Sequence, residues 1–101
     1  MEKQQKIKIS NYFNIANKAG YVIFGADNFK NYNHKMYLII VREDAGKSLL
    51  KEANFVADKT LARIYSICVE DFKEITRLDN CKLFGIKNKG LSEQIIKLLE
   101  V

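Results

Sequence analysis

The 101-residue chain contains no proline, two cysteines and one histidine. Cys68 and Cys81 are too few for a disulfide framework and lack the spacing of a zinc site, so we expect two reduced thiols. His34 has neither a nucleophile nor an orienting acid beside it in the sequence, and we expect it on the surface rather than in a catalytic centre. Because proline is absent, no proline marks a linker between domains.

Long apolar runs are missing as well. No segment is long enough to span a bilayer, and the lysines of MEKQQKIKIS are not followed by the apolar stretch of a signal peptide. We therefore expect a soluble, cytoplasmic protein without a membrane partner. Hydrophobic residues make up 48% of the chain, which is enough for one core and predicts a single domain over residues 1–101. We expect this domain to be a monomer.

The net charge of +5 is concentrated at the two ends of the chain. Residues 1–35 hold six lysines and two acidic residues, and residues 82–101 hold four lysines and two acidic residues. Between them, seven basic residues face eight acidic ones. If the termini lie on one side of the fold, they form a patch suited to polyphosphate. The alternative is a lysine-rich surface that only keeps the protein soluble.

Helical and strand patterns alternate along the whole chain. The predicted helices cover Ile9–Ala19, Ala26–Tyr32, a segment capped by Asp44 that continues to Val56, Glu70–Arg77 and Leu91–Leu99. The predicted strands cover Tyr21–Phe24, Met36–Val41, Leu61–Val69 and Lys82–Ile86. The run MYLIIV is apolar throughout, as expected of a central strand that is buried on both faces. This order of elements predicts an α/β fold, a three-layer sandwich with helices on both faces of a sheet.

Sequence patterns that could indicate catalysis are weak. AGKSLL resembles the end of a phosphate-binding loop, but Val41 stands where the first glycine of that motif belongs. Glu43 and Asp44 would also place negative charge against a phosphate. We interpret Gly46–Ser48 as the start of a helix with Lys47 in solvent. No nucleophile elbow, acidic pair or metal-ligand spacing is found, so we expect no enzyme, no metal and no cofactor.

The stretch GYVIFGADNFKN, residues 20–31, places two glycines around a short apolar strand and follows them with a polar helix start. Together with the buried strand after it and the K-N-K-G of residues 87–90, this order resembles the kink-turn RNA-binding ribosomal-protein family of the L-seven-Ae and L-thirty-e type. The resemblance is greatest to the small bacterial YlxQ-like branch and extends roughly over Ile9–Leu99. It implies a four-stranded mixed sheet, no catalytic activity, and structured kink-turn-like RNA, ribosomal or other, or the ribosome as a partner.

The resemblance also implies which residues contact RNA. A glycine at the corner between strand and helix lets the backbone turn sharply and approach a ligand closely. Side chains from the first helical turn would then reach base edges that a kink has opened. The implied contact residues are Gly25, Ala26, Asp27, Asn28, Lys30, Asn31, Leu78, Lys87 and Lys89. Ala26, Asp27, Asn28 and Asn31 stand where the family usually has Thr, Asn, Glu and Lys.

Two alternatives remain at this stage. In the first, the domain is a protein-interaction module of the same fold whose RNA surface has decayed, with Tyr21, Phe24 and Phe29 serving a protein partner. In the second, Gly20 only ends a helix, and the side chains of Asp27 and Asn28 only cap the next one.

Overall fold

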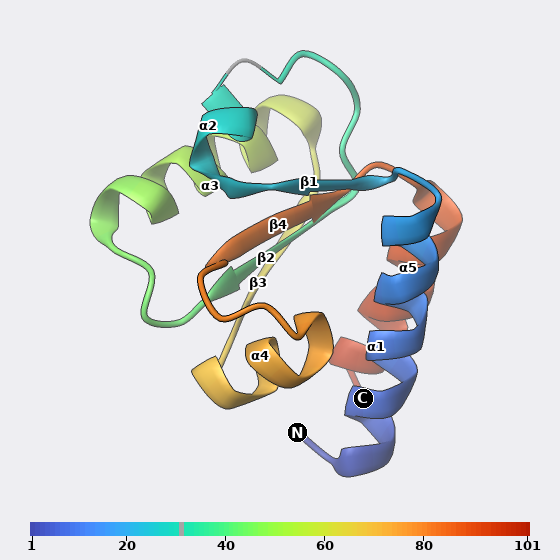
Figure 1. The fold of residues 1–101 in the computed structure, drawn as a ribbon. Helices are drawn as coiled ribbons and strands as arrows, with labels where there is room; N and C mark the ends of the chain where they lie inside the picture. The colour runs from blue at the N-terminus through green and yellow to red at the C-terminus, as the bar shows by residue number, and fades with distance from the viewer. Residues whose placement is uncertain (31) are drawn as a thin grey trace.

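The computed structural model describes residues 1–30 and 32–101, in which five helices and four strands alternate (Figure 1). The helices are α1 (Lys3–Lys18), α2 (Gly25–Lys30), α3 (Lys47–Thr60), α4 (Val69–Thr76) and α5 (Lys89–Leu99). The strands are β1 (Val22–Phe24), β2 (Leu38–Arg42), β3 (Arg63–Ile67) and β4 (Leu83–Ile86). Each of the four strands falls in a predicted strand region, with shifts at the ends.

The strands form one mixed sheet in the order β1-β4-β2-β3. β4 runs antiparallel to both β1 and β2, whereas β2 and β3 are parallel and are connected through α3. All five residues of β2 are buried, and the strand lies between β3 and β4. The prediction of a central, buried strand near residues 36–41 is therefore confirmed, although the strand starts two residues later and ends at Arg42.

Each face of the sheet carries its own apolar cluster, because successive side chains of a strand point to opposite faces. Leu38 and Ile40 of β2 pack with α1, α4 and α5, while Ile39 and Val41 pack with α2 and α3. Figure 1 shows the sheet between these two groups of helices. The predicted three-layer α/β/α sandwich around a four-stranded mixed sheet is confirmed.

Several helix boundaries differ from the predictions for local reasons. α1 starts at Lys3 rather than Ile9, because Glu2 and Gln5 form a capping box ahead of the apolar periodicity. α5 starts at Lys89 rather than Leu91, because the Asn88 side chain accepts a hydrogen bond from the Leu91 amide at 2.9 Å. α2 ends at Lys30, and the predicted continuation passes through Asn31, which lies outside the described residues.

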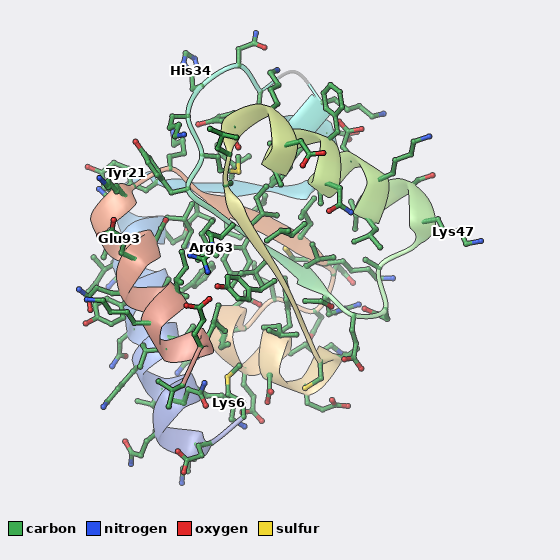
Figure 2. All side chains as sticks on the ribbon, turned by 180° about the vertical axis from the view of Figure 1, so that it is seen from behind. Lys6, Tyr21, His34, Lys47, Arg63 and Glu93 are labelled. Atoms are coloured by element: carbon green, nitrogen blue, oxygen red, sulfur yellow. The ribbon has the colours of Figure 1, made fainter. Side chains whose placement is uncertain are left out.

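The predicted cap of α3 is wrong. Gly46, with an extended backbone, is the N-cap residue, and no side chain in residues 1–30 or 32–101 caps this helix with a hydrogen bond. Asp44 instead accepts two hydrogen bonds from the Arg42 guanidinium. Lys47, at the first position of α3, is exposed as expected. In Figure 2 it points away from the fold at the outer end of the helix, and His34 lies on the surface of the loop before β2.

Candidate nucleic-acid interface

Gly25 forms the corner between β1 and α2. Its φ of +78° lies in the left-handed region, which costs a residue with a side chain roughly 1–2 kcal/mol and glycine nothing. Apart from its chain neighbours and the backbone of its own helix, no atom of the described residues lies within 4 Å of the position that a Cβ would occupy, so the corner is open on that side. Gly20, at the end of α1, has the same conformation, with a φ of +79°, and is equally open.

The predicted contact residues of α2 differ in how available they are. Asp27 and Lys30 are exposed. Asn28 is exposed as well, but its Nδ2 donates a hydrogen bond of 2.7 Å to the Phe24 carbonyl of the preceding turn. That bond holds the Asn28 side chain against the strand-to-helix corner and leaves Asn28 Oδ1 free to accept a hydrogen bond from a ligand. Asn31, also predicted to contact RNA, lies outside the described residues.

A groove of about 530 Å³ lies between α2 and α3 and includes two of the predicted contact residues. Its lining residues are Ala26, Lys30, Ser48, Leu49, Lys51, Glu52 and Phe55. The sequence predictions missed the part of this lining that α3 provides. Phe55 could have indicated this wall, because it lies off the buried stripe of α3, which consists of Ala53, Val56, Ala57 and Thr60. An aromatic residue outside that stripe is exposed, and the Phe55 side chain is 61% accessible.

Lys87 and Lys89 lie at the other end of the sheet from Gly25. The Lys87 amide donates a 2.8 Å hydrogen bond to the carbonyl of Tyr21, which precedes β1, whereas Gly25 follows β1. The four residue-to-residue steps from Tyr21 to Gly25 correspond to about 13 Å at about 3.3 Å per residue. Asn88, between the two lysines, caps α5. The predicted site residues are therefore not assembled into one cluster.

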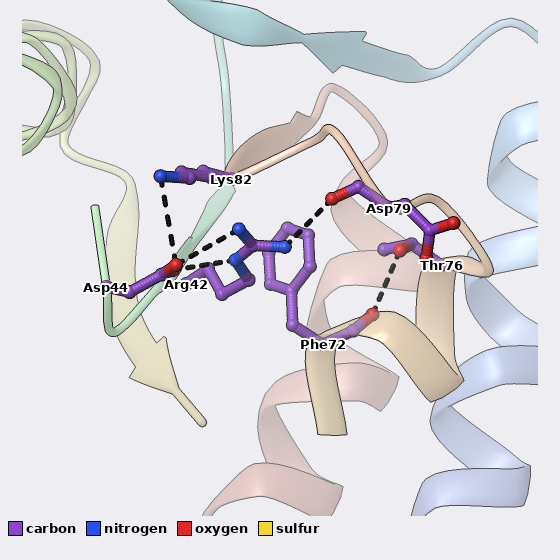
Figure 3. Close-up of polar contacts among 6 residues, drawn as sticks. All are labelled: Arg42, Asp44, Phe72, Thr76, Asp79 and Lys82. Atoms are coloured by element: carbon purple, nitrogen blue, oxygen red, sulfur yellow. Dashed lines mark hydrogen bonds and ion pairs between the residues drawn. The ribbon is translucent and has the colours of Figure 1, made fainter. Parts of the chain in front are cut away.

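The loop with Leu78 leads into β4 at the same end of the sheet as Gly25, since Phe84 pairs with Phe24. Leu78 is 39% exposed, so its side chain is accessible from solvent. The buried Arg42 joins this loop to the one after β2 (Figure 3). Its Nη1 donates to the Asp79 carbonyl at 3.1 Å, while Nε and Nη2 donate to the carboxylate of Asp44 at 2.7 and 3.1 Å.

These charges shift the titration of the Arg42–Asp44 pair. Hydrogen bonds from the Arg42 guanidinium lower the pKa of the Asp44 carboxyl below its usual range, and the same bonds raise the pKa of Arg42. Lys82 Nζ adds a further positive charge 3.7 Å from Asp44 Oδ2. The arrangement is a structural clip between two loops, because the buried Arg42 guanidinium is hydrogen-bonded on both sides and is not available to a ligand.

The basic chain ends meet on one side of the molecule, where α1 and α5 pack side by side and both termini lie near each other (Figure 1). Their positive charge is partly neutralised there. Lys6 Nζ lies 2.6 Å from Glu74 Oε2 and 3.5 Å from Asp71 Oδ1, and the Glu74 hydrogen bond raises the pKa of Lys6. This basic side is separate from the Gly25 corner.

Of the three aromatic residues expected to serve a protein partner in the alternative hypothesis, two are buried or partly buried. Phe29 is 1% exposed and belongs to the cluster under α2 and α3, and Phe24 packs against the opposite cluster. Only Tyr21 of that set is exposed, at 38%. In the described part of the chain, no three His, Cys, Asp or Glu side chains gather to hold a metal ion. No helix of those residues is long and apolar enough to cross a bilayer.

Comparison with known proteins finds a similarity of fold only. No family model matches the sequence, and no curated protein matches it. Among solved structures, the fold is similar to that of a protein with unknown function from Bacillus halodurans, with a TM-score of 0.74. The match covers 93% of this chain and 98% of that one at 16% sequence identity. At this identity, the similarity establishes a shared three-layer architecture.

Proposed function

We propose that this chain is a non-catalytic, cytoplasmic RNA-binding protein that recognises structured, kink-turn-like RNA, ribosomal or other. One observation carries the proposal. The groove between α2 and α3 adjoins the open Gly25 corner and is lined by Ala26 and Lys30, two residues that the family resemblance assigns to the RNA contact. Exposed cations bind the phosphates of RNA, and an exposed aromatic ring can stack on an unpaired base.

The charge pattern around the groove supports the same proposal. Lys30 and Lys51 extend from the two helices that form its walls, and neither makes an ion pair with a carboxylate in the described part of the chain. Cations that are not neutralised by the protein are available to phosphates, whose neutralisation dominates nucleic-acid affinity. In contrast, Lys6 and Arg42 are already paired with acids.

The experiment measures affinity for a kink-turn stem over a series of salt concentrations, with Lys30→Gln and Lys89→Gln as a matched pair. Both lysines are exposed helical residues, and each substitution removes one positive charge, but they lie near opposite ends of the sheet. We expect Lys30→Gln to weaken binding and to lower the slope of log affinity against log salt by about one. Lys89→Gln should have a smaller effect.

Two results would contradict the proposal. A parent protein that binds no structured RNA at low salt would show that RNA binding is wrong. A larger loss in Lys89→Gln would place the RNA on the side of α1 and α5, and equal losses would mean that binding depends on total charge and not on the Gly25 corner.

A further inference from the structure

The α3 wall of the groove presents four side chains on one helical face. Ser48, Lys51, Glu52 and Phe55 follow the spacing of three and four residues that aligns side chains along a helix. Across from them, α2 contributes Ala26 and Lys30. The volume of about 530 Å³ is in the range of sites for small organic ligands, such as a single nucleotide.

The packing of the residues that the structure describes does not explain why Phe55 is exposed. The ring belongs to neither apolar cluster, and it pairs with no other aromatic ring among the described residues. Its accessible surface faces the groove beside Lys51, the residue one turn earlier on α3. An aromatic face next to a cation is complementary to a ligand that has both a flat ring and a negative charge.

Glu52 narrows the choice of ligand further. Glu52 lines the groove, and a carboxylate there repels an anion but accepts hydrogen bonds from N–H groups. The base of a nucleotide offers such N–H groups at its edge, whereas the phosphates are attached to the sugar and lie away from the base. The groove therefore suits a base on the inside and phosphates at the lysines.

We propose that the α2–α3 groove holds one unpaired nucleotide of the bound RNA, with its base stacked on Phe55 and its phosphates at Lys30 and Lys51. This inference rests on the proposed RNA-binding function and adds a site for a single base. Stacking accepts any base, because every base has a π-face, and the Glu52 carboxylate then orients the base edge. A nucleotide released from the helix by a kink has the required freedom to enter.

The first test uses the absence of tryptophan from the chain. Phe55→Trp places a single tryptophan in the groove, and Leu61→Trp places one at the far end of α3, where Leu61 is 81% exposed. Addition of a kink-turn stem should quench the fluorescence of Phe55→Trp, because a stacked base contacts the indole directly. Leu61→Trp should change little. The same stem with abasic residues in its bulge should bind with much less quenching of Phe55→Trp.

The second test compares affinities of Phe55→Ser and Leu61→Ser for the same stem. Both residues are exposed, so both variants should keep the circular dichroism spectrum of the parent. We expect Phe55→Ser to bind on the order of 5- to 100-fold more weakly and Leu61→Ser to match the parent. If the parent binds the stem but Phe55→Ser binds equally well, the base site is wrong and the RNA-binding function stands. If the parent binds no RNA at low salt, both proposals fail.

Discussion

Alanine substitution at the two left-handed glycines should separate a folding role from a binding role. Gly20 and Gly25 have φ values of +79° and +78°, and a Cβ at either position would meet no atom of another described residue within 4 Å beyond its local backbone. The two substitutions therefore impose the same backbone strain and no steric clash. Only Gly25 lies at the corner that we propose faces RNA. Gly20→Ala is thus a matched control for Gly25→Ala.

The expected loss of unfolding free energy can be worked out from the backbone conformation alone. An alanine held in the left-handed region costs about 1–2 kcal/mol. Alanine also restricts the unfolded chain relative to glycine, which offsets about 0.4–1 kcal/mol of that cost. Each variant should therefore lose roughly 0.5–1.5 kcal/mol of unfolding free energy, which lowers the melting temperature of a domain of this size by about 3–10 °C. The losses at Gly20 and Gly25 should agree within about 0.5 kcal/mol.

Binding should distinguish the two variants. Urea denaturation gives the unfolding free energies, and titration of a kink-turn stem well below both melting temperatures gives the affinities of the folded proteins. Gly25→Ala should bind RNA more weakly than Gly20→Ala, because its Cβ projects into the open space at the corner. If both variants bind like the parent, RNA does not approach the Gly25 backbone. A stability loss at Gly25 several times that at Gly20 would refute the reasoning from backbone strain.

Three further substitutions test the scaffold. Asp44→Asn should weaken the acid dependence of stability, because Arg42 lowers the pKa of the Asp44 carboxyl in the folded state. The ionised carboxyl therefore favours folding above its ordinary pKa of about 3.9, and this contribution is lost as the pH falls. Between about pH 5 and pH 2, the urea midpoint should fall less in the variant than in the parent. Leu61→Gly should raise the melting temperature, with a gain of about 0.5–1 kcal/mol, because Leu61 ends α3 with a φ of 62° and is 81% exposed; a loss would reveal packing of its side chain. Gly85→Ala should cost about 1–3 kcal/mol in urea denaturation, because its Cβ would collide with Met36 Sδ, and a neutral result would mean that Met36 repacks freely.

The architecture was predictable because a buried sheet has a strong sequence signature. The four strands appear as short apolar runs, and MYLIIV has no polar position to place in water. Arg42 was not predictable as a buried strand residue, since its burial depends on Asp44 and on a carbonyl 37 residues away at Asp79. The early start of α1 had a visible signal in Glu2 and Gln5, but these residues precede the apolar periodicity on which the prediction relied.

The candidate site was predictable only where it is contiguous in sequence. The Gly25 corner and the exposed residues of α2 follow from one short stretch. The sequence prediction grouped Lys87 and Lys89 with this corner, but their position depends on the register of β4. Because β4 runs antiparallel to β1, the two lysines lie at the start of β1 and not at its end. The α3 wall was missed for a related reason, because α3 meets α2 only through the packing of the fold.

That packing sets the position of the groove through the residue at the centre of β4. A Cβ on Gly85 would lie 3.0 Å from Phe29 Cζ and would collide with Met36, so only glycine lets these two side chains rest directly on the sheet. Phe29 is the buried residue of α2, and its depth fixes how close this six-residue helix lies to the sheet. Since α3 rests on the same face, the depth of Phe29 also sets the distance between the walls that carry Lys30 and Phe55. The absence of a side chain at Gly85 thereby helps to set the width of the groove between α2 and α3.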